Sequence, residues 1–260
     1  MGLVRALRTA SAALWYGDCD ARGVPRWNPF LAVRPALDLC LLTWASGVLD
    51  ALSYVRAGVF TANMTGNTVI LGLAMVGPGR SRVFYCLIAL GAFALGVVMA
   101  GLVLVRWREA GDWTRDLKTG SALELPFVAG LTALWILFPA KGPFVAVAAL
   151  TALAACALGI QSVAVRRMKL SGVVTTFITG TLTTAILAGI QRKGSGGKSE
   201  EAPNSPPALA GMLAIYVGAA VTGGALSMAR SAFAAPAAFL PLAVVFLRSL
   251  GNWDTVRRER

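Results

Sequence analysis

The chain has 260 residues, of which 57% are hydrophobic and only 14% are charged, and its mean hydropathy is +0.68. Such a composition, with repeated long apolar runs, is typical of an integral membrane protein and excludes a soluble globular domain. The formal net charge of +12 comes from short basic clusters between apolar runs, so it does not predict nucleic-acid binding. We expect these clusters to set the membrane topology and to contact anionic lipid.

The amino-acid content also excludes several kinds of chemistry. The chain has no histidine, so general-base catalysis by histidine, histidine-ligated metals and histidine pH switches are absent. The four cysteines are scattered, without a CxxC pair or the spacing of a disulfide framework. No nucleophile elbow, P-loop, HExxH motif or pair of carboxylates occurs in the apolar region. We therefore predict a protein that is not an enzyme and has neither a cofactor nor a metal site.

At the N-terminus, residues 1–36 predict a cytoplasmic tail rather than a cleaved signal peptide. Two arginines stand near the start, but no apolar stretch of signal-peptide length follows them before Gly17. A short interfacial helix is expected at Leu3–Tyr16. The following stretch, Asp20–Pro35, is more polar and contains three prolines.

Eight apolar segments follow, which predict an all-α polytopic transmembrane bundle of six to eight helical segments over residues 37–247. They are Leu37–Val55, Val59–Val76, Val83–Val105, Leu125–Phe138, Phe144–Val165, Val173–Ile190, Ala208–Ala229 and Ala232–Phe246. The fourth and the eighth are short for a full crossing. A polar loop is expected at residues 191–207, and a basic tail at residues 248–260.

The two halves of the transmembrane region are similar in sequence. Gly58–Asn67, GVFTANMTGN, recurs in weaker form as Gly172–Thr181, GVVTTFITGT. Gly47–Ala51 likewise corresponds to Gly159–Val163, just ahead of each copy. We therefore predict two homologous halves, residues 37–138 and 144–246. Four spans in each half would make the repeats parallel, whereas one re-entrant segment in each half would make them inverted.

Threonine and glycine residues within these copies form candidate polar stripes. Thr61, Thr65 and Thr68 are spaced so that in a helix they share one face. The second-half stripe consists of Thr175, Thr179 and Thr183. Gly66 and Gly180, in the middle of the stripes, allow close backbone approach or local unwinding, which at membrane depth is tolerated only inside protein or beside a cavity. The stripes fit either tight helix packing or a pathway for a substrate or ion.

Two amides and one acid distinguish the first half. Asn63 and Asn67 lie one helical turn apart, and an amide in hydrocarbon needs hydrogen-bond partners. Asp50 is the carboxylate that lies well inside an apolar segment, with Arg56 as a candidate partner. It is either a hydrated residue near the interface or a coordinating or proton-carrying group. Gln161 is expected as its neutral counterpart in the second half.

These motifs resemble the YoaK-like family of bacterial inner-membrane proteins. The resemblance covers about Leu37–Phe246 and rests on Gly-x-x-Asp-Ala with Met-Thr-Gly-Asn in the first half, and on Gly-Ile-Gln with Thr-Thr-Phe-Ile-Thr-Gly in the second. It implies a multi-pass membrane protein of a family without a known function. Ser162 departs from the family pattern, in which Asn usually follows the Gln, so a symmetric pair of amides is in doubt.

Our hypothesis is a transporter or channel for a small solute or an ion, with its site between the two Thr/Gly segments. The residues expected to line this site are Asp50, Asn63, Thr65, Gly66, Asn67, Gln161, Thr175, Thr179 and Gly180. The alternative is a non-transporting scaffold or assembly factor in which these segments are a packing seam. We expect the bacterial inner membrane as location, both termini in the cytoplasm, and leave a homo-oligomer open.

Overall fold

The computed structural model describes residues 29–105, 113–138, 142–167 and 206–251, together with residues 183, 186, 187 and 190. These residues form an all-α fold without strands, as the sequence predicts. The helices are α2 (Pro29–Ala57), α3 (Met64–Val76), α4 (Arg80–Val105), α5 (Trp113–Leu137), α6 (Phe144–Arg167), α8 (Pro206–Met228) and α9 (Pro236–Gly251). The predicted interfacial helix at Leu3–Tyr16, most of the polar loop and residues 252–260 of the basic tail lie outside the described residues.

The chain divides into two compact units, Met1–Cys40 and Leu41–Arg260. The described part of the first unit is the beginning of α2. The second unit contains the rest of α2 and the other helices, and the packing described below lies within it. Helix α2 begins at Pro29, so helix extends eight residues beyond the expected boundary at residue 37.

Five of the described helices are long and apolar enough to cross a membrane. These segments are Leu37–Ala57, Arg80–Leu104, Arg115–Leu137, Phe144–Arg167 and Leu209–Met228. Helices α3 and α9 are apolar but shorter. Many of the large apolar side chains that the fold leaves exposed belong to these helices, including Leu73, Leu95, Leu102, Val221 and Leu247. Such side chains on helix surfaces fit a lipid environment.

Two sequence-based segment boundaries are wrong. Helix α5 begins at Trp113 rather than near Leu125, because polar residues of its first half, Asp116, Ser121 and Glu124, are buried in the protein and do not end the helix. The second segment, expected as a helix from Val59, is helical only from Met64.

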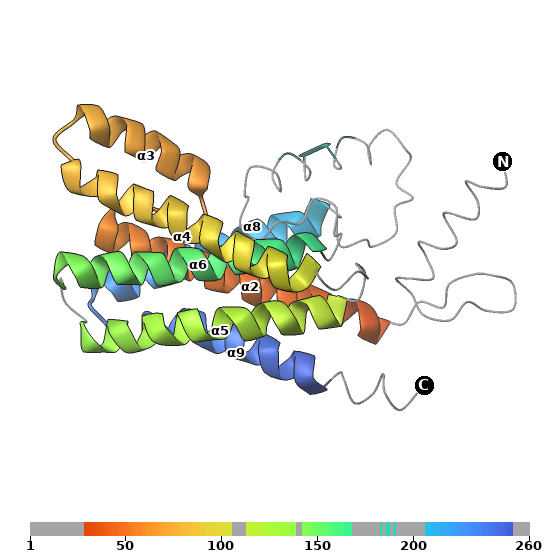
Figure 1. The fold of residues 1–260 in the computed structure, drawn as a ribbon. Helices are drawn as coiled ribbons and strands as arrows, with labels where there is room; N and C mark the ends of the chain where they lie inside the picture. Colours follow the sequence, from red (N-terminus) through yellow and green to blue (C-terminus); the bar gives the residue numbers. More distant parts are fainter. Residues whose placement is uncertain are drawn as a thin grey trace, which may run out of the picture. The chain divides into compact units, whose positions relative to one another are not determined.

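Corresponding helices of the two halves run in opposite directions. At the end of α2, Arg56 donates to the Phe138 carbonyl, just before α6 begins, whereas Gln161 near the end of α6 donates to the carbonyl of Leu42. Helices α2 and α6 are therefore antiparallel. Trp135, near the end of α5, donates to the carbonyl of Ser231 at 2.9 Å, just before α9 begins. In Figure 1, α2, α5 and α8 run toward one end and α4, α6 and α9 toward the other.

Small residues allow the helices to approach closely. A side chain at Gly96 on α4 would meet the carbonyl of Cys156 on α6, and one at Gly159 would lie 3.2 Å from the Cα of Gly96. Helices α2 and α8 repeat this pattern, since a side chain at Gly223 would lie 2.9 Å from the Cα of Val48. Small residues at membrane helix interfaces allow backbone contact where no hydrophobic effect drives association. The glycines therefore fix which helices are neighbours.

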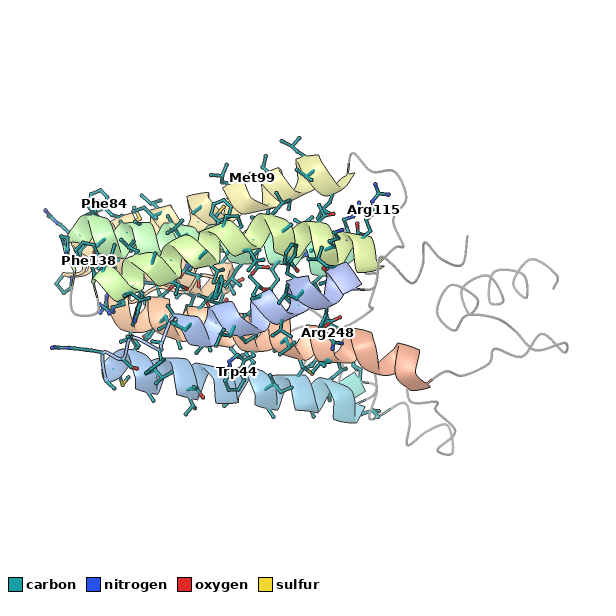
Figure 2. All side chains as sticks on the ribbon, turned by 90° about the horizontal axis from the view of Figure 1, so that it is seen from below. Trp44, Phe84, Met99, Arg115, Phe138 and Arg248 are labelled. Carbon is teal, nitrogen blue, oxygen red and sulfur yellow. The ribbon has the colours of Figure 1, made fainter. Side chains whose placement is uncertain are left out.

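A proline in α9 allows a further hydrogen bond between α2 and α9. Pro241 has no N–H group, so the carbonyl of Ala237, four residues earlier, lacks its helical donor. The indole Nε1 of Trp44 on α2 donates to this carbonyl at 3.2 Å. Figure 2 shows Trp44 within the bundle, Arg115 and Arg248 near one end, and Phe84 and Phe138 near the other.

We predict that Gly96→Ala destabilises the protein while Gly91→Ala on the same helix does not. The added methyl group at Gly96 meets a backbone carbonyl that cannot rotate away, which costs about 1–3 kcal/mol. Gly91 has nothing within 4 Å, so alanine there gains up to about 1 kcal/mol of helix stability. Thermal unfolding of the two variants in detergent micelles measures the difference. Equal stability of both variants would contradict the assigned α4–α6 contact.

Candidate functional site

The chain turns back into the bundle after α2. Gly58, with φ of 70°, ends the helix, and its N–H donates to the carbonyl of Tyr54 at 2.9 Å. A left-handed glycine is the usual terminator of a helix. Residues 58–63 are not helical, and Asn63 then caps α3 by accepting from the N–H of Gly66 at 3.1 Å. We call residues 58–63 the return segment.

Asp50 holds the return segment against α2. Its Oδ1 accepts from the backbone N–H of Thr61 at 2.6 Å, from that of Ala62 at 2.7 Å, and from the Thr61 hydroxyl at 3.1 Å. Its Oδ2 accepts from the hydroxyl of Tyr216 on α8 at 2.6 Å. Asp50 is only 3% exposed. One carboxylate therefore joins α2, the return segment and α8.

Asn67 completes the hydrogen bonding of the same segment. Its Oδ1 accepts from the N–H of Phe60 at 2.8 Å, and its Nδ2 donates to the carbonyl of Phe60 at 2.6 Å. The amide thus satisfies both backbone groups of a residue that has no helix or strand partner. A side chain at Gly66 would lie 3.1 Å from the ring of Phe60, and this ring stacks on Tyr54 at 5.0 Å. The first-half glycine therefore makes room for the return segment.

The predicted stripe of first-half threonines does not form. Thr61 lies in the return segment, ahead of the helix, so it does not share a face with Thr65 and Thr68. Thr65 and Thr68 are exposed on α3, as is Asn63, and the Thr68 hydroxyl donates to the carbonyl of Met64 at 3.0 Å. Polar groups of this helix start are therefore accessible on the described structure.

Gln161 lies near Asp50 but is not opposite to it. Its Nε2 donates to the hydroxyl of Ser46 at 2.9 Å and to the carbonyl of Leu42 at 3.2 Å. Ser46 precedes Asp50 by one helical turn on α2, so the two polar groups are neighbours along one face. The other second-half candidates, Thr175, Thr179 and Gly180, lie outside the described residues.

The expected partner of Asp50 is wrong. The guanidinium of Arg56 lies 4.0 Å from the ring centroid of Trp135. The side-chain partner of Asp50 from another helix is instead the hydroxyl of Tyr216. The cause is the left-handed backbone conformation of Gly58, which ends α2 and brings the return segment to the Asp50 carboxylate. Sequence reasoning missed Tyr216, although a hydroxyl-bearing aromatic in an otherwise apolar run is a recognisable signal.

Sequence reasoning also missed a buried acid in the middle of α5. Glu124 lies within the candidate span of α5 and is 1% exposed, so Asp50 is not the one acid inside an apolar helix. The fourth apolar segment was expected to start at Leu125, which placed Glu124 in a loop. Apolar residues stand on both sides of Glu124, and a hydropathy average over a longer window would have placed this acid within one helix.

Comparison with known proteins agrees with this architecture. Residues 39–247 match the family described as "Protein of unknown function (DUF1275)". The chain belongs to this family. It is also 37% identical over 145 residues to the UPF0700 transmembrane protein YoaK of Bacillus subtilis (strain 168), a match that covers 55% of this chain and 62% of that protein. No solved structure matches the chain. The predicted family resemblance is confirmed, and the chain is a membrane protein.

We predict that Asp50→Ala releases the return segment from α2. Hydrogen bonds to a charged group contribute about 1.5–3 kcal/mol each, and this change leaves two buried N–H groups without an acceptor. Hydrogen exchange read by mass spectrometry should show faster exchange at Thr61 and Ala62. The matched control is Tyr216→Phe, which removes one donor and keeps the ring, so its effect on these amides should be much smaller. Unchanged protection in Asp50→Ala would show that the carboxylate does not hold the segment.

Proposed function

We propose that the protein is a transporter or channel for a small polar solute or an ion, with its site beside the return segment. The observation that carries the proposal is the non-helical backbone at residues 58–63, which contains the buried Val59, Thr61 and Ala62 and lies in sequence between a candidate membrane-spanning helix and the 13-residue helix α3. Irregular backbone at membrane depth is tolerated inside protein or beside a cavity, and broken helices of this kind form the binding sites of many transporters.

The opposite directions of the two halves support the same function. Helices α2 and α6 are antiparallel, and so are α5 and α9. Inverted repeats place their binding site where the halves meet, with one broken helix from each half. We propose that Thr175, Thr179 and Gly180 complete the site from the second half, as the similarity of the two segments predicts.

The described residues divide into two roles. Asp50 and Asn67 accept and donate within the fold, so they position the return segment and do not bind the solute directly. Asn63 and Thr65 are exposed at the start of α3. These two residues are therefore the candidates for contact with the solute.

The same proposal includes the cellular setting. We propose the bacterial inner membrane as location, with both termini in the cytoplasm, because the larger share of the 24 Lys and Arg residues then lies inside. Anionic lipid would contact the basic loops, and a homo-oligomer is compatible with the lipid-exposed helix faces. Neither catalysis nor a cofactor is part of the proposed function.

A scaffold or assembly role is the second candidate, and a specific observation favours it. The side chains of Asp50 and Asn67 form their hydrogen bonds with the chain's own backbone and with Tyr216. Polar groups satisfied in this way explain the two residues by folding alone. In that case the return segment is a packing device, and the exposed residues of α3 have no solute to bind.

The transport proposal predicts that Thr65→Val reduces solute movement about two- to tenfold, the effect of one lost hydrogen bond of about 0.5–1.5 kcal/mol. Protein reconstituted in liposomes on a supported membrane is exposed to gradients of Na⁺, K⁺, chloride, phosphate, neutral amino acids and sugars, and transient currents and tracer uptake are recorded. Thr68→Val is the matched control, because that exposed hydroxyl already bonds to the helix backbone. No movement of any probe by the folded parent protein would favour the scaffold role.

A further inference from the structure

The feature that neither the family nor the Asp50 site accounts for is the buried acid of α5. Glu124 lies nine residues into the candidate span Arg115–Leu137 and is 1% exposed, and its Oε1 has no hydrogen-bond partner. Ser121, one turn earlier on the same face, is 2% exposed, and its hydroxyl also has no partner. Two adjacent polar side chains are thus buried without the partners that such groups normally have.

The register of α5 on α6 places this pair level with a second set of polar groups. A side chain at Gly120 would lie 2.6 Å from the Cβ of Ala164, and one at Gly130 would lie 3.7 Å from Leu153. The two helices are antiparallel, so Glu124 is at the level of Gln161, which donates to Ser46 on α2. Asp50 lies one further turn along α2. The membrane interior therefore contains polar groups at two neighbouring depths.

Helix α5 also contains a proline at this level. Pro126, two residues after Glu124, has no N–H group, so the carbonyl of Ala122 lacks its helical donor. Prolines inside membrane helices commonly mark places where the helix bends or opens. A proline beside a buried acid gives the helix a place to open, through which the carboxyl group could change its access to water.

Charged groups on the neighbouring elements do not neutralise Glu124. Asp116 on α5 is paired with Arg167 on α6 at 3.2 Å, two turns from Glu124. Helix α2 also contacts α5, where Arg56 lies over the ring of Trp135 about three turns from Glu124, and α2 further contains Asp50 and Tyr54. The other charged or titratable groups on α5 and on the helices packed against it lie at other levels or near the helix ends: Arg115, Lys118, Cys156, Arg166, Arg248, Arg80, Arg82, Tyr85 and Cys86. In the part of the chain that the structure describes, no cation therefore pairs with Glu124.

We propose that Glu124 is an exchangeable proton-binding site within the membrane. A carboxylate without a partner is costly in an apolar interior, and a bound proton removes its charge. A metal cation would need about six oxygen ligands, whereas α5 offers one carboxyl group and one hydroxyl here. Among the described residues, no group of three acidic, cysteine or histidine side chains could hold a metal ion. The bound ligand is therefore a proton.

This inference deepens the proposed function by naming the proton as the coupling ion. Only the coupling of the proton to solute movement rests on the proposed function. Proton binding by itself is testable without a known solute. An apolar carbodiimide, dicyclohexylcarbodiimide, reaches acids inside membranes. A protonated carboxyl group adds across one C=N bond, its proton passing to nitrogen and its oxygen bonding to carbon. The acyl group then shifts to nitrogen, so the full mass of the reagent stays on the side chain and nothing leaves.

The experiment treats the full-length protein in liposomes with this reagent at several pH values and maps the adduct by peptide mass spectrometry. We expect labelling of Glu124 that falls at least tenfold from acidic to alkaline buffer, because the ionised form does not take part. Glu124→Gln, of almost equal shape, should lose the adduct. Asp50→Asn should retain it, because the Asp50 carboxylate is held by four donors and is not the target.

Three results would overturn the proposal. These are no adduct on Glu124 in the folded protein at any pH, an adduct that is independent of pH, and protection by Na⁺ at constant pH, which would indicate a metal cation instead. Ser121→Ala keeps the carboxyl group and serves as a second variant, with changed pH dependence but retained labelling. If labelling occurs as expected while no solute moves in the liposome assay, the proton site stands and the transport function fails.

Discussion

The bonds between the Asp50 carboxylate and the peptide groups of Thr61 and Ala62 are the interaction on which the described architecture depends. A chain that leaves helix inside a membrane must find acceptors for its N–H groups, and water is absent there. Asp50 provides them, and its second oxygen binds Tyr216 on α8. The acid therefore permits the return segment, and this segment determines where α3 begins. Without it, residues 58–76 would have no reason to form anything but one continuous helix.

Close helix packing explains why this polar arrangement stays in place. The backbones of α4 and α6 meet at Gly96 and Gly159, and those of α2 and α8 meet near Val48 and Gly223. In lipid, such contacts rely on dispersion and shape, because burial of apolar surface gains little there. The α2–α8 contact also sets the distance over which the Tyr216 hydroxyl reaches Asp50. The small residues and the polar bonds consequently stabilise one another, and neither set alone defines the site.

The sequence predicts the helical membrane fold and the importance of Asp50 and Asn67, because an acid or an amide in an apolar run needs an explanation whatever the tertiary structure is. It does not predict what these side chains bind. Thr61 follows the spacing of a helical stripe, yet the chain after the left-handed Gly58 stays non-helical as far as Asn63, and the threonine spacing contains no sign of that. Glu124 was missed for the opposite reason. Its neighbours Asp116 and Ser121 made the start of α5 look like a loop, whereas burial against α6 and an ion pair allow these residues within a helix.

The two halves differ in their acidic residues, which lie in the membrane helices of the first half. Two identical halves in opposite orientations would offer the same groups to both membrane faces. Here Asp50 precedes the end of α2 by seven residues, and neutral Gln161 precedes the end of α6 by six, so an acid in the first half corresponds to an amide in the second. Helices α5 and α9 both contain an interior proline, Pro126 and Pro241, but the residue two places before it is Glu124 in one and Phe239 in the other. Among the described residues, the buried acids of the candidate spans, Asp38, Asp50, Asp116 and Glu124, therefore all belong to the first half. For the proposed transporter, protonation would act on that half alone, which makes two otherwise similar halves distinguishable.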